Sequence, residues 1–467
     1  MKGEPDFLRN VRDEVVDARQ WLDRAIIIAY AVLAGLAVVG FTLLADAAFG
    51  AYQNMRGAIW WWPLVWTPAV TALVVWLVRR WAPGAAGSGV PQVLTALAPE
   101  TPLDTRGRFV SLKLSIAKIL AVSGGLLAGL SIGRQGPSVQ VAAGIMLHAR
   151  RWLSPRSGIS DRELLVAGGA AGIAAAFNTP LGGIVFAIEE LSRRLMERSS
   201  ALMLVAIVVA GLVAVSAFGN LSYFGRVRTD GVSWWGLIGP GTVVAVACGL
   251  LGGLLARLML ASFTGLPDRF CAYRRKRPVA FAAICGFVVA VIAVISGGAA
   301  VGVGHQHTHL LLEQAATDPQ AHTPLLFTGL KFIASWLSAW TGMPGGIFGP
   351  SLSLGAGVGA DIAWLLDSPH GMALIALGMC GFLAAVTQTP ITAMIIVMEM
   401  TDGHGMVLSL MACALVASGV SRMISRPLYS TMSALMLRSV RPAEESTDSR
   451  LTEPGPDSRP GQESAPR

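Results

Sequence analysis

Long apolar runs recur along the whole sequence and constrain its fold more than any other feature. A membrane-spanning helix needs about 20 mainly apolar residues, and the mean hydropathy of +0.59 with 14% charged residues lies far from an ordinary soluble chain. We therefore predict an all-α integral membrane protein. The runs cover residues 25–45, 59–78, 164–188, 201–221, 234–255, 279–295, 325–340, 372–400 and 406–420.

Glycine and proline interrupt this apolar sequence. Several runs are too long or too broken to be single straight spans, and the chain holds 53 Gly and 25 Pro. Non-helical backbone at membrane depth occurs only where protein or a cavity satisfies its polar groups. Broken and tilted helices that start or stop inside the membrane are therefore expected.

The net charge of +8 comes with arginines in short clusters beside the apolar runs. The positive-inside rule explains such clusters better than nucleic-acid binding does, and the first cluster, before residue 25, predicts a cytoplasmic N-terminus. The five cysteines are scattered and give no disulfide or metal framework. The histidines at 305–309 favour a solvated loop over a metal site, and no cleavable signal peptide is visible.

Four segments follow from these patterns. Residues 1–24 place apolar side chains at roughly helical spacing and predict a short amphipathic helix on the cytoplasmic surface. Residues 25–220 and 221–433 form two membrane repeats. Residues 434–467 are almost free of apolar side chains and predict a disordered cytoplasmic tail.

The two membrane repeats are visible as internal similarity. Residues 168–189 align without gaps on 378–399, an offset of 210, and residues 133–144 echo 346–357. A fainter pair is 87–89 with 302–304. Duplicated halves with breaks in matching positions are typical of transporters whose substrate site lies between the halves. The sequence alone does not decide whether the halves are parallel or inverted.

Three glycine–proline turns, at 87–91, 133–138 and 346–350, are the candidate substrate site. A turn that starts a helix at membrane depth aims free backbone N–H groups inward, where the helix dipole favours an anion. One such turn alone would more simply reflect close helix packing. Three of them in a repeat-built protein favour an anion site.

Polar side chains near these turns are further candidates. Ser88 and Tyr429 could add hydroxyl donors, and Arg134 either supplies positive potential or locks its turn. Lys118 and Lys331 lie in or beside apolar segments, where charges are functional candidates. Glu189 and Glu399 end matching apolar runs, and a helix-capping role is favoured for both over proton transfer.

These motifs together resemble the CLC family of chloride channels and proton–chloride antiporters, over residues 25 to 433. Residues 87–91 resemble its GSGIP motif, 133–137 its GREGP motif and 346–350 its GxFxP motif, and Tyr429 fits its pore tyrosine. The resemblance implies two inverted-topology repeats, a homodimer in the cell (inner) membrane with one pore per subunit, both termini in the cytoplasm, no CBS domains and no cofactor. It implies chloride binding by Ser88, Gly133, Arg134, Gln135, Gly136, Gly346, Ile347, Phe348 and Tyr429.

One residue departs from the family pattern. The glutamate of GREGP is the family's external gate and proton carrier, and here that position is Gln135. Glu190, 55 residues further on, matches the internal proton glutamate. A glutamine is neutral at every relevant pH and cannot carry a proton out of the site. We therefore predict passive, chloride-selective transport uncoupled from protons.

Three other functions compete with passive chloride transport. A proton-coupled antiporter could use another acid, such as Glu190. A fluoride exporter is disfavoured because Ser88 and Tyr429 suit a chloride-type site. An enzyme is disfavoured because the sequence has no nucleophile with a base, no metal-ligand spacing and no phosphate loop.

Overall fold

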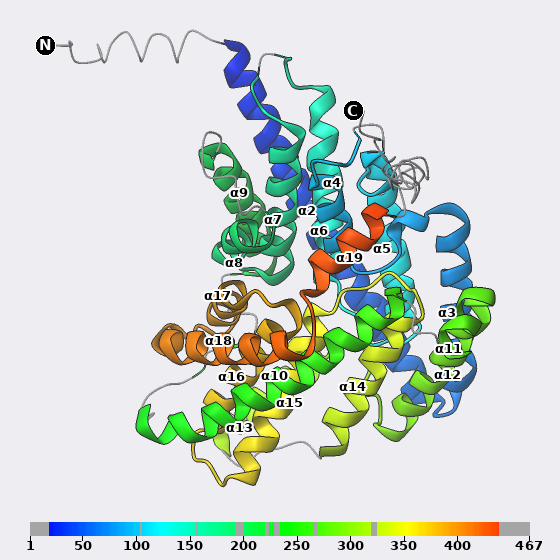
Figure 1. The fold of residues 1–467 in the computed structure, drawn as a ribbon, viewed down its shortest axis with the longest axis vertical. Coiled ribbons are helices and arrows are strands. Elements are labelled where there is room, and N and C mark those ends of the chain that lie inside the picture. Colours follow the sequence, from blue (N-terminus) through cyan, green and yellow to red (C-terminus); the bar gives the residue numbers. More distant parts are fainter. Residues whose placement is uncertain are drawn as a thin grey trace, which may run out of the picture.

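The computed structural model describes residues 18–102, 105–155, 157–191, 200–219, 224–225, 227, 234–264, 269–318 and 325–438. The regular secondary structure of these residues consists of helices and one isolated β-bridge (Figure 1). The first half contains α2 (Ala18–Ala58), α3 (Trp62–Trp81), η1 (Pro83–Ala85), α4 (Val90–Leu97), η2 (Arg106–Arg108), α5 (Leu112–Leu127), α6 (Gln135–His148), η3 (Ala149–Arg151), α7 (Asp161–Phe177), α8 (Pro180–Phe186), η4 (Ala187–Leu191) and α9 (Ser200–Phe218).

The second half repeats this order of long spans and short, broken helices. It contains α10 (Trp234–Thr264), α11 (Arg269–Lys276), α12 (Pro278–Ile295), α13 (His305–Thr317), α14 (Leu325–Trp340), α15 (Phe348–Leu365), α16 (Gly371–Thr387), α17 (Pro390–Thr401), η5 (His404–Met406), α18 (Val407–Ile424) and α19 (Leu428–Arg438).

Seven helical segments in the described part are long and apolar enough to cross a membrane, which agrees with the predicted class. Six of them overlap predicted runs. The seventh, Arg106–Leu127, contains α5 and was not among the predicted runs. The histidines at 305, 307 and 309 lie in the first turns of helix α13 and are all half-buried, so the predicted loop there is wrong.

The outer segment boundaries differ from the predicted ones. Helix α2 already begins at Ala18, so the end of the predicted surface helix is continuous with the first span. Helix α19 continues to Arg438, five residues past the predicted end of the second repeat. Residues 1–17 and 439–467, which hold most of the predicted surface helix and tail, lie outside the described residues.

Two long apolar runs are broken in the same way, one in each half. The capping residues that follow α7 and α16 are Asn178 and Gln388, and both have left-handed backbone, at φ 57° and 58°. A left-handed residue is a common end for a helix. A proline then starts α8 at Pro180 and α17 at Pro390, where its missing N–H costs no hydrogen bond.

The two halves are joined by reciprocal helix caps. The Glu399 carboxylate accepts the backbone N–H groups of Leu181 at 3.2 Å and Gly182 at 2.7 Å. The Glu189 carboxylate accepts those of Ile391 at 3.2 Å and Thr392 at 2.7 Å. Contacts that repeat with the roles exchanged mark a two-fold relation. The two halves are therefore related by an approximate two-fold axis, and both carboxylates cap helices as the sequence predicted.

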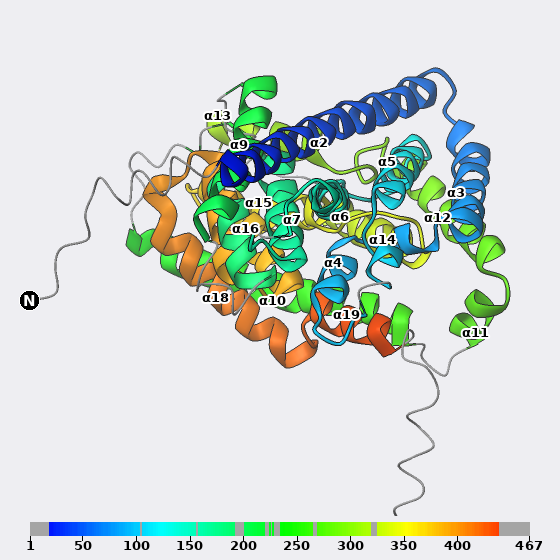
Figure 2. The ribbon, with the colours of Figure 1, turned by 90° about the horizontal axis from the view of Figure 1, so that it is seen from above.

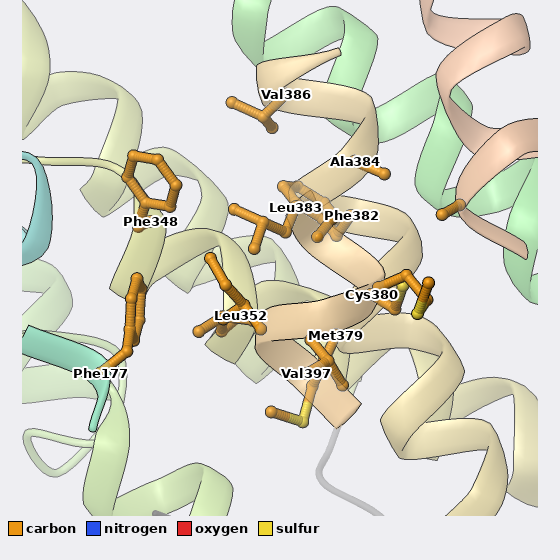
Figure 3. Close-up of a cluster of buried hydrophobic side chains, with 14 of the residues drawn as sticks. Phe177, Phe348, Leu352, Met379, Cys380, Phe382, Leu383, Ala384, Val386 and Val397 are labelled. Atoms are coloured by element: carbon orange, nitrogen blue, oxygen red, sulfur yellow. The ribbon is translucent and has the colours of Figure 1, made fainter. Parts of the chain in front are cut away.

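Small residues let the central helices of each half pack with their backbones in contact. A Cβ on Gly172 of α7 would collide with the Ser138 carbonyl of α6, and one on Gly359 of α15 with the Leu374 carbonyl of α16. Between the halves, the Phe348 ring of α15 packs edge-on against that of Phe177 of α7, with centroids 5.9 Å apart (Figure 3). This buried cluster fixes where α15 starts relative to the first half.

The two sides of the membrane region can be told apart from three neighbouring helices. Helix α2 runs along one flank (Figure 2), and α3 returns beside α12, so α3 ends at Arg79–Arg80 on the side where α2 starts. Helix α12 ends on the opposite side, because Gly298 lies against Arg56 near the end of α2. We call the side where α2 starts the N-side and the opposite one the far side.

Candidate functional site

The three glycine turns converge between the two halves. Gly133 and Gly346 exchange two backbone hydrogen bonds, each 2.7 Å from N to O, and these form the isolated antiparallel bridge. This bridge holds the starts of α6 and α15 beside each other. Since first-turn N–H groups have no acceptor within their own helix, two sets of free donors and two positive dipole ends lie close together.

The turn at 87–89 closes the same site from the N-side. The Gly345 N–H donates to the Gly87 carbonyl at 3.2 Å, and the Gly89 N–H donates to the Gln92 side chain at 2.9 Å. A Cβ on Gly136 would lie 2.6 Å from the Ser88 hydroxyl oxygen. Only glycine at 136 leaves room for that hydroxyl beside the start of α6.

Gln135 is the first residue of α6 and lies at the centre of this arrangement. Its side chain is buried, and its Oε1 has no hydrogen-bond partner among the described residues. Oε1 lies 2.7 Å from the point where a Cβ on Gly133 would be and 3.1 Å from the same point on Gly349. The amide therefore fills the space between the two opposed helix starts.

Tyr429, at the start of α19, borders the N-side of the site. Its ring stacks on Phe348 with centroids 6.0 Å apart. Its hydroxyl lies close to that of Ser88, and neither hydroxyl has a partner in good hydrogen-bond geometry within the described residues. Ile347, the residue before α15, is also buried there. Two neighbouring hydroxyls at the end of the N-side cavity can both donate hydrogen bonds to an anion, which is an acceptor only.

Arg134 points away from the turn toward α2. Its guanidinium forms an ion pair with Asp46, and the Arg134 side chain is 3% exposed while that of Asp46 is 59% exposed. The sequence left two roles open for Arg134, and this ion pair favours the one in which Arg134 locks the turn. Its positive charge nevertheless remains next to the site.

Lys118 and Lys331 are both fully buried and occupy equivalent places in the two halves. Lys118 Nζ donates to the carbonyls of Ala85 at 2.8 Å and Gly87 at 2.7 Å. Lys331 Nζ donates to the Gly302 carbonyl at 2.8 Å. Each ammonium therefore holds one glycine turn, a role that the sequence had left open.

Three cavities reach toward the site. One of about 500 Å³ on the N-side is lined by Ser88, Ile347 and Tyr429 and by Arg79, Arg274 and Arg275. A second cavity, of about 750 Å³, is also lined by Tyr429, together with Glu190, Arg422 and Arg426. A third, of about 420 Å³ on the far side, is lined by Asp46, Gln53, Val303, Gly304, His305 and His307.

Glu190 reaches the second cavity because of a π-helical turn. Helix α8 widens into η4, which contains both Glu189 and Glu190, and such turns often occur at functional sites. Glu189 caps α17, whereas Glu190 lines the cavity that Tyr429 also borders. Glu190 does not line the Ser88 cavity, so the two approaches to Tyr429 are separate.

A family model described as voltage gated chloride channel matches residues 70–422. The chain belongs to this family. The membership agrees with the predicted fold of inverted repeats and makes the chain a multi-pass membrane protein. No group of three or more His, Cys, Asp or Glu among the described residues is arranged to hold a metal ion.

Relatives in the chloride channel family include bacterial exchangers. The chain is 30% identical over 440 residues to the H(+)/Cl(-) exchange transporter ClcA of Salmonella typhimurium strain LT2, with 87% of this chain and 86% of the relative covered. It is 30% identical over 411 residues to ClcA of Citrobacter koseri, with 82% and 81% covered.

Solved structures of the chloride channel family share this fold. A slow cyanobacterial Cl-/H+ antiporter gives a TM-score of 0.74 at 22% identity, with 90% of this chain and 98% of that chain covered. A CLC-type fluoride/proton antiporter gives a TM-score of 0.68 at 20% identity, with 92% and 99% covered.

Proposed function

We propose that this protein conducts chloride passively across the membrane, without coupling to protons. The observation that carries the proposal is the position of Gln135, whose neutral amide lies between the opposed starts of α6 and α15. Backbone N–H groups and hydroxyls are well suited to a halide, because several weak donors hold a small anion without trapping it. Transport of this kind needs no cofactor and no chemical step.

The chemistry of the side chain supports the lack of coupling. A carboxylate at this point would be drawn to the two helix starts, would compete with the anion and would leave only when protonated. The amide of Gln135 carries no charge and has no proton to exchange, and its N–H₂ group is itself a donor for a halide. An anion can therefore occupy the site without displacing a bound acid.

The charge distribution supports a cytoplasmic N-side. Arg79, Arg274 and Arg275 line the cavity that leads to Ser88 on that side, and basic residues favour the cytoplasmic face of a membrane. We further propose that both termini are cytoplasmic and that the membrane is the cell (inner) membrane, as the family resemblance implies. The arginines would raise the local chloride concentration at the inner entrance.

Paired flux measurements test this function. Purified protein in liposomes with an imposed chloride gradient should release chloride without driving protons against their gradient. Gln135→Glu should introduce proton movement. The matched control is Gln53→Glu, which adds the same charge to the far-side cavity away from the helix starts and should not. Sustained uphill proton movement by the unmodified protein would refute the proposal.

A proton-coupled antiporter is the second candidate, and Glu190 is the observation that favours it. Its carboxylate lines the cavity beside Tyr429, where it could deliver protons from the N-side. The relatives named above are H(+)/Cl(-) exchangers. If this candidate is right, Glu190→Gln abolishes the uphill proton movement. Fluoride export is a weaker third candidate, which a fluoride flux exceeding the chloride flux would support.

We also propose that the protein forms a homodimer, as the family resemblance implies. Helices α8, α9, α17 and α18 leave an apolar face exposed, with Leu408 77% and Leu415 53% exposed. The two caps by Glu189 and Glu399 join α8 and α17 on this part of the molecule. Native mass spectrometry from lipid nanodiscs should give twice the mass of one chain.

A further inference from the structure

The second half carries a copy of the entry turn that holds Ser88. In the first half, Lys118 fixes the turn at 87–89 through the Gly87 carbonyl. In the second half, Lys331 fixes the turn at 302–304 through the Gly302 carbonyl. The second turn faces the far side, because residues 303 and 304 line the third cavity together with Asp46 and Gln53 of α2. Equivalent turns that face opposite sides mark the halves as inverted repeats.

Val303 is the structural counterpart of Ser88. The Ser88 Oγ lies 2.6 Å from the Cβ position of Gly136, at the start of α6, and the Val303 Cγ1 lies 2.5 Å from that of Gly349, at the start of α15. The two residues are about equally buried, at 9% and 8% exposure. Each therefore covers the start of one pore-facing helix, from opposite sides.

Val303 also lies next to Gln135. The Gln135 Oε1 lies 3.1 Å from the same Gly349 Cβ position that Val303 approaches to 2.5 Å. Glycine at 349 thus leaves one small space that the amide and the valine methyl share. Val303 also lines the far-side cavity, whereas Gln135 does not, so Val303 lies between Gln135 and that cavity.

The chemistry of the two counterparts differs. Ser88 offers a hydroxyl donor to an anion, whereas the methyl groups of Val303 offer none and displace water. Valine is also stiff, because its branched side chain strongly prefers one rotamer. Hydrophobic constrictions with these properties impede ions by excluding their hydration water.

We propose that Val303 forms the constriction of the anion path on the far side, and that it limits both the rate of passage and the size of the anions that pass. The inference rests on the proposed anion transport. The anion path is therefore asymmetric, with the Ser88 hydroxyl donor on one side of Gln135 and the apolar Val303 on the other.

Side-chain size tests the constriction directly. In liposomes, Val303→Ala should raise chloride flux about threefold or more and raise the flux of a larger anion, thiocyanate, by a greater factor. Val303→Leu should lower both. Val301→Ala is the matched control, since Val301 lies in the same segment and lines the same cavity without being among the atoms nearest Gly349. It should leave the flux ratio unchanged.

Cysteine labelling tests the position independently of flux. The five native cysteines are all buried, but Cys271 lines the N-side cavity that Ser88 also lines. The Cys271→Ser variant therefore serves as background and carries each introduced cysteine. A membrane-impermeant thiol reagent should label Val303→Cys in intact cells but not in inside-out vesicles, and Ser88→Cys in the reverse pattern. Labelling of Val303→Cys in neither preparation, or only from the Ser88 side, overturns the proposal.

The outcomes separate this inference from the function on which it rests. If the unmodified protein carries no chloride, the proposed function fails. If it carries chloride while Val303→Ala and Val303→Leu keep its flux and its thiocyanate-to-chloride ratio, only the constriction fails, and Val303 is a core residue.

Discussion

The reciprocal caps give a prediction whose magnitude follows from the structure. Glu399→Ala removes the acceptor of the Leu181 and Gly182 N–H groups at the start of α8. A hydrogen bond to a charged group contributes roughly 1.5–3 kcal/mol net. Counting the 2.7 Å bond in full and the 3.2 Å bond only in part, we expect a loss of about 2 kcal/mol.

The two-fold relation makes the same prediction for the other cap. Glu189→Ala should cost about the same, because its carboxylate makes bonds of matching lengths, 2.7 and 3.2 Å, to α17. The double substitution should cost about twice as much, since each carboxylate serves a different helix start. For a chain of this size we expect roughly 2–4 °C of Tm for each single substitution.

Thermal stability in detergent, followed by size-exclusion chromatography after heating, measures these losses. Glu313→Ala is the control, because Glu313 is 60% exposed and pairs with His309 on α13, and exposed pairs of this kind contribute little. A Tm for either capping variant within the error of the control would contradict the reasoning. So would a double variant no less stable than each single one.

Two further substitutions probe the anion path itself. Gly136→Ala places a methyl 2.6 Å from the Ser88 hydroxyl and 3.0 Å from the Ser88 carbonyl, so chloride flux should fall at least tenfold. The control Gly40→Ala, whose new methyl has no atom within 4 Å, should leave the flux unchanged. Equal fluxes for the two variants would show that Gly136 does not face the path. Asp46→Asn removes a negative charge from the far-side cavity and also breaks the ion pair that holds Arg134 at its turn. The lost charge should raise chloride entry at low ionic strength, and this rise should largely vanish near 1 M salt, where the Debye length is about 3 Å. A change in flux that persists at 1 M salt would report the lost lock on the turn.

Much of the fold was predictable because local sequence determines it. Apolar length predicts most of the spans, and the Thr-Pro pairs at 179–180 and 389–390 stand where two long runs break. The segment Arg106–Leu127 is absent from the predicted spans because Lys113 and Lys118 interrupt its apolar pattern. Only the structure shows that the buried Lys118 Nζ donates hydrogen bonds to two backbone carbonyls.

The arrangement of the site was less accessible to sequence reasoning. Glycine and proline predict each turn separately, and the internal repeat indicates that the turns are related. Which groups meet across the halves depends on tertiary packing: Glu399 with Gly182, and Gly133 with Gly346, are each some two hundred residues apart. No local pattern distinguishes those partners from other glycines and acids.

The bridge between Gly133 and Gly346 also has a consequence for biogenesis. Ribosomes add about 5–20 residues per second, so roughly 10–40 s pass between synthesis of the first glycine and of its partner. During this time the first half resides in the bilayer with the start of α6 unpaired, and water or lipid headgroups must solvate it. The ion path therefore comes into existence only when the second half inserts in the opposite orientation, and a nascent chain halted before that point cannot leak anions.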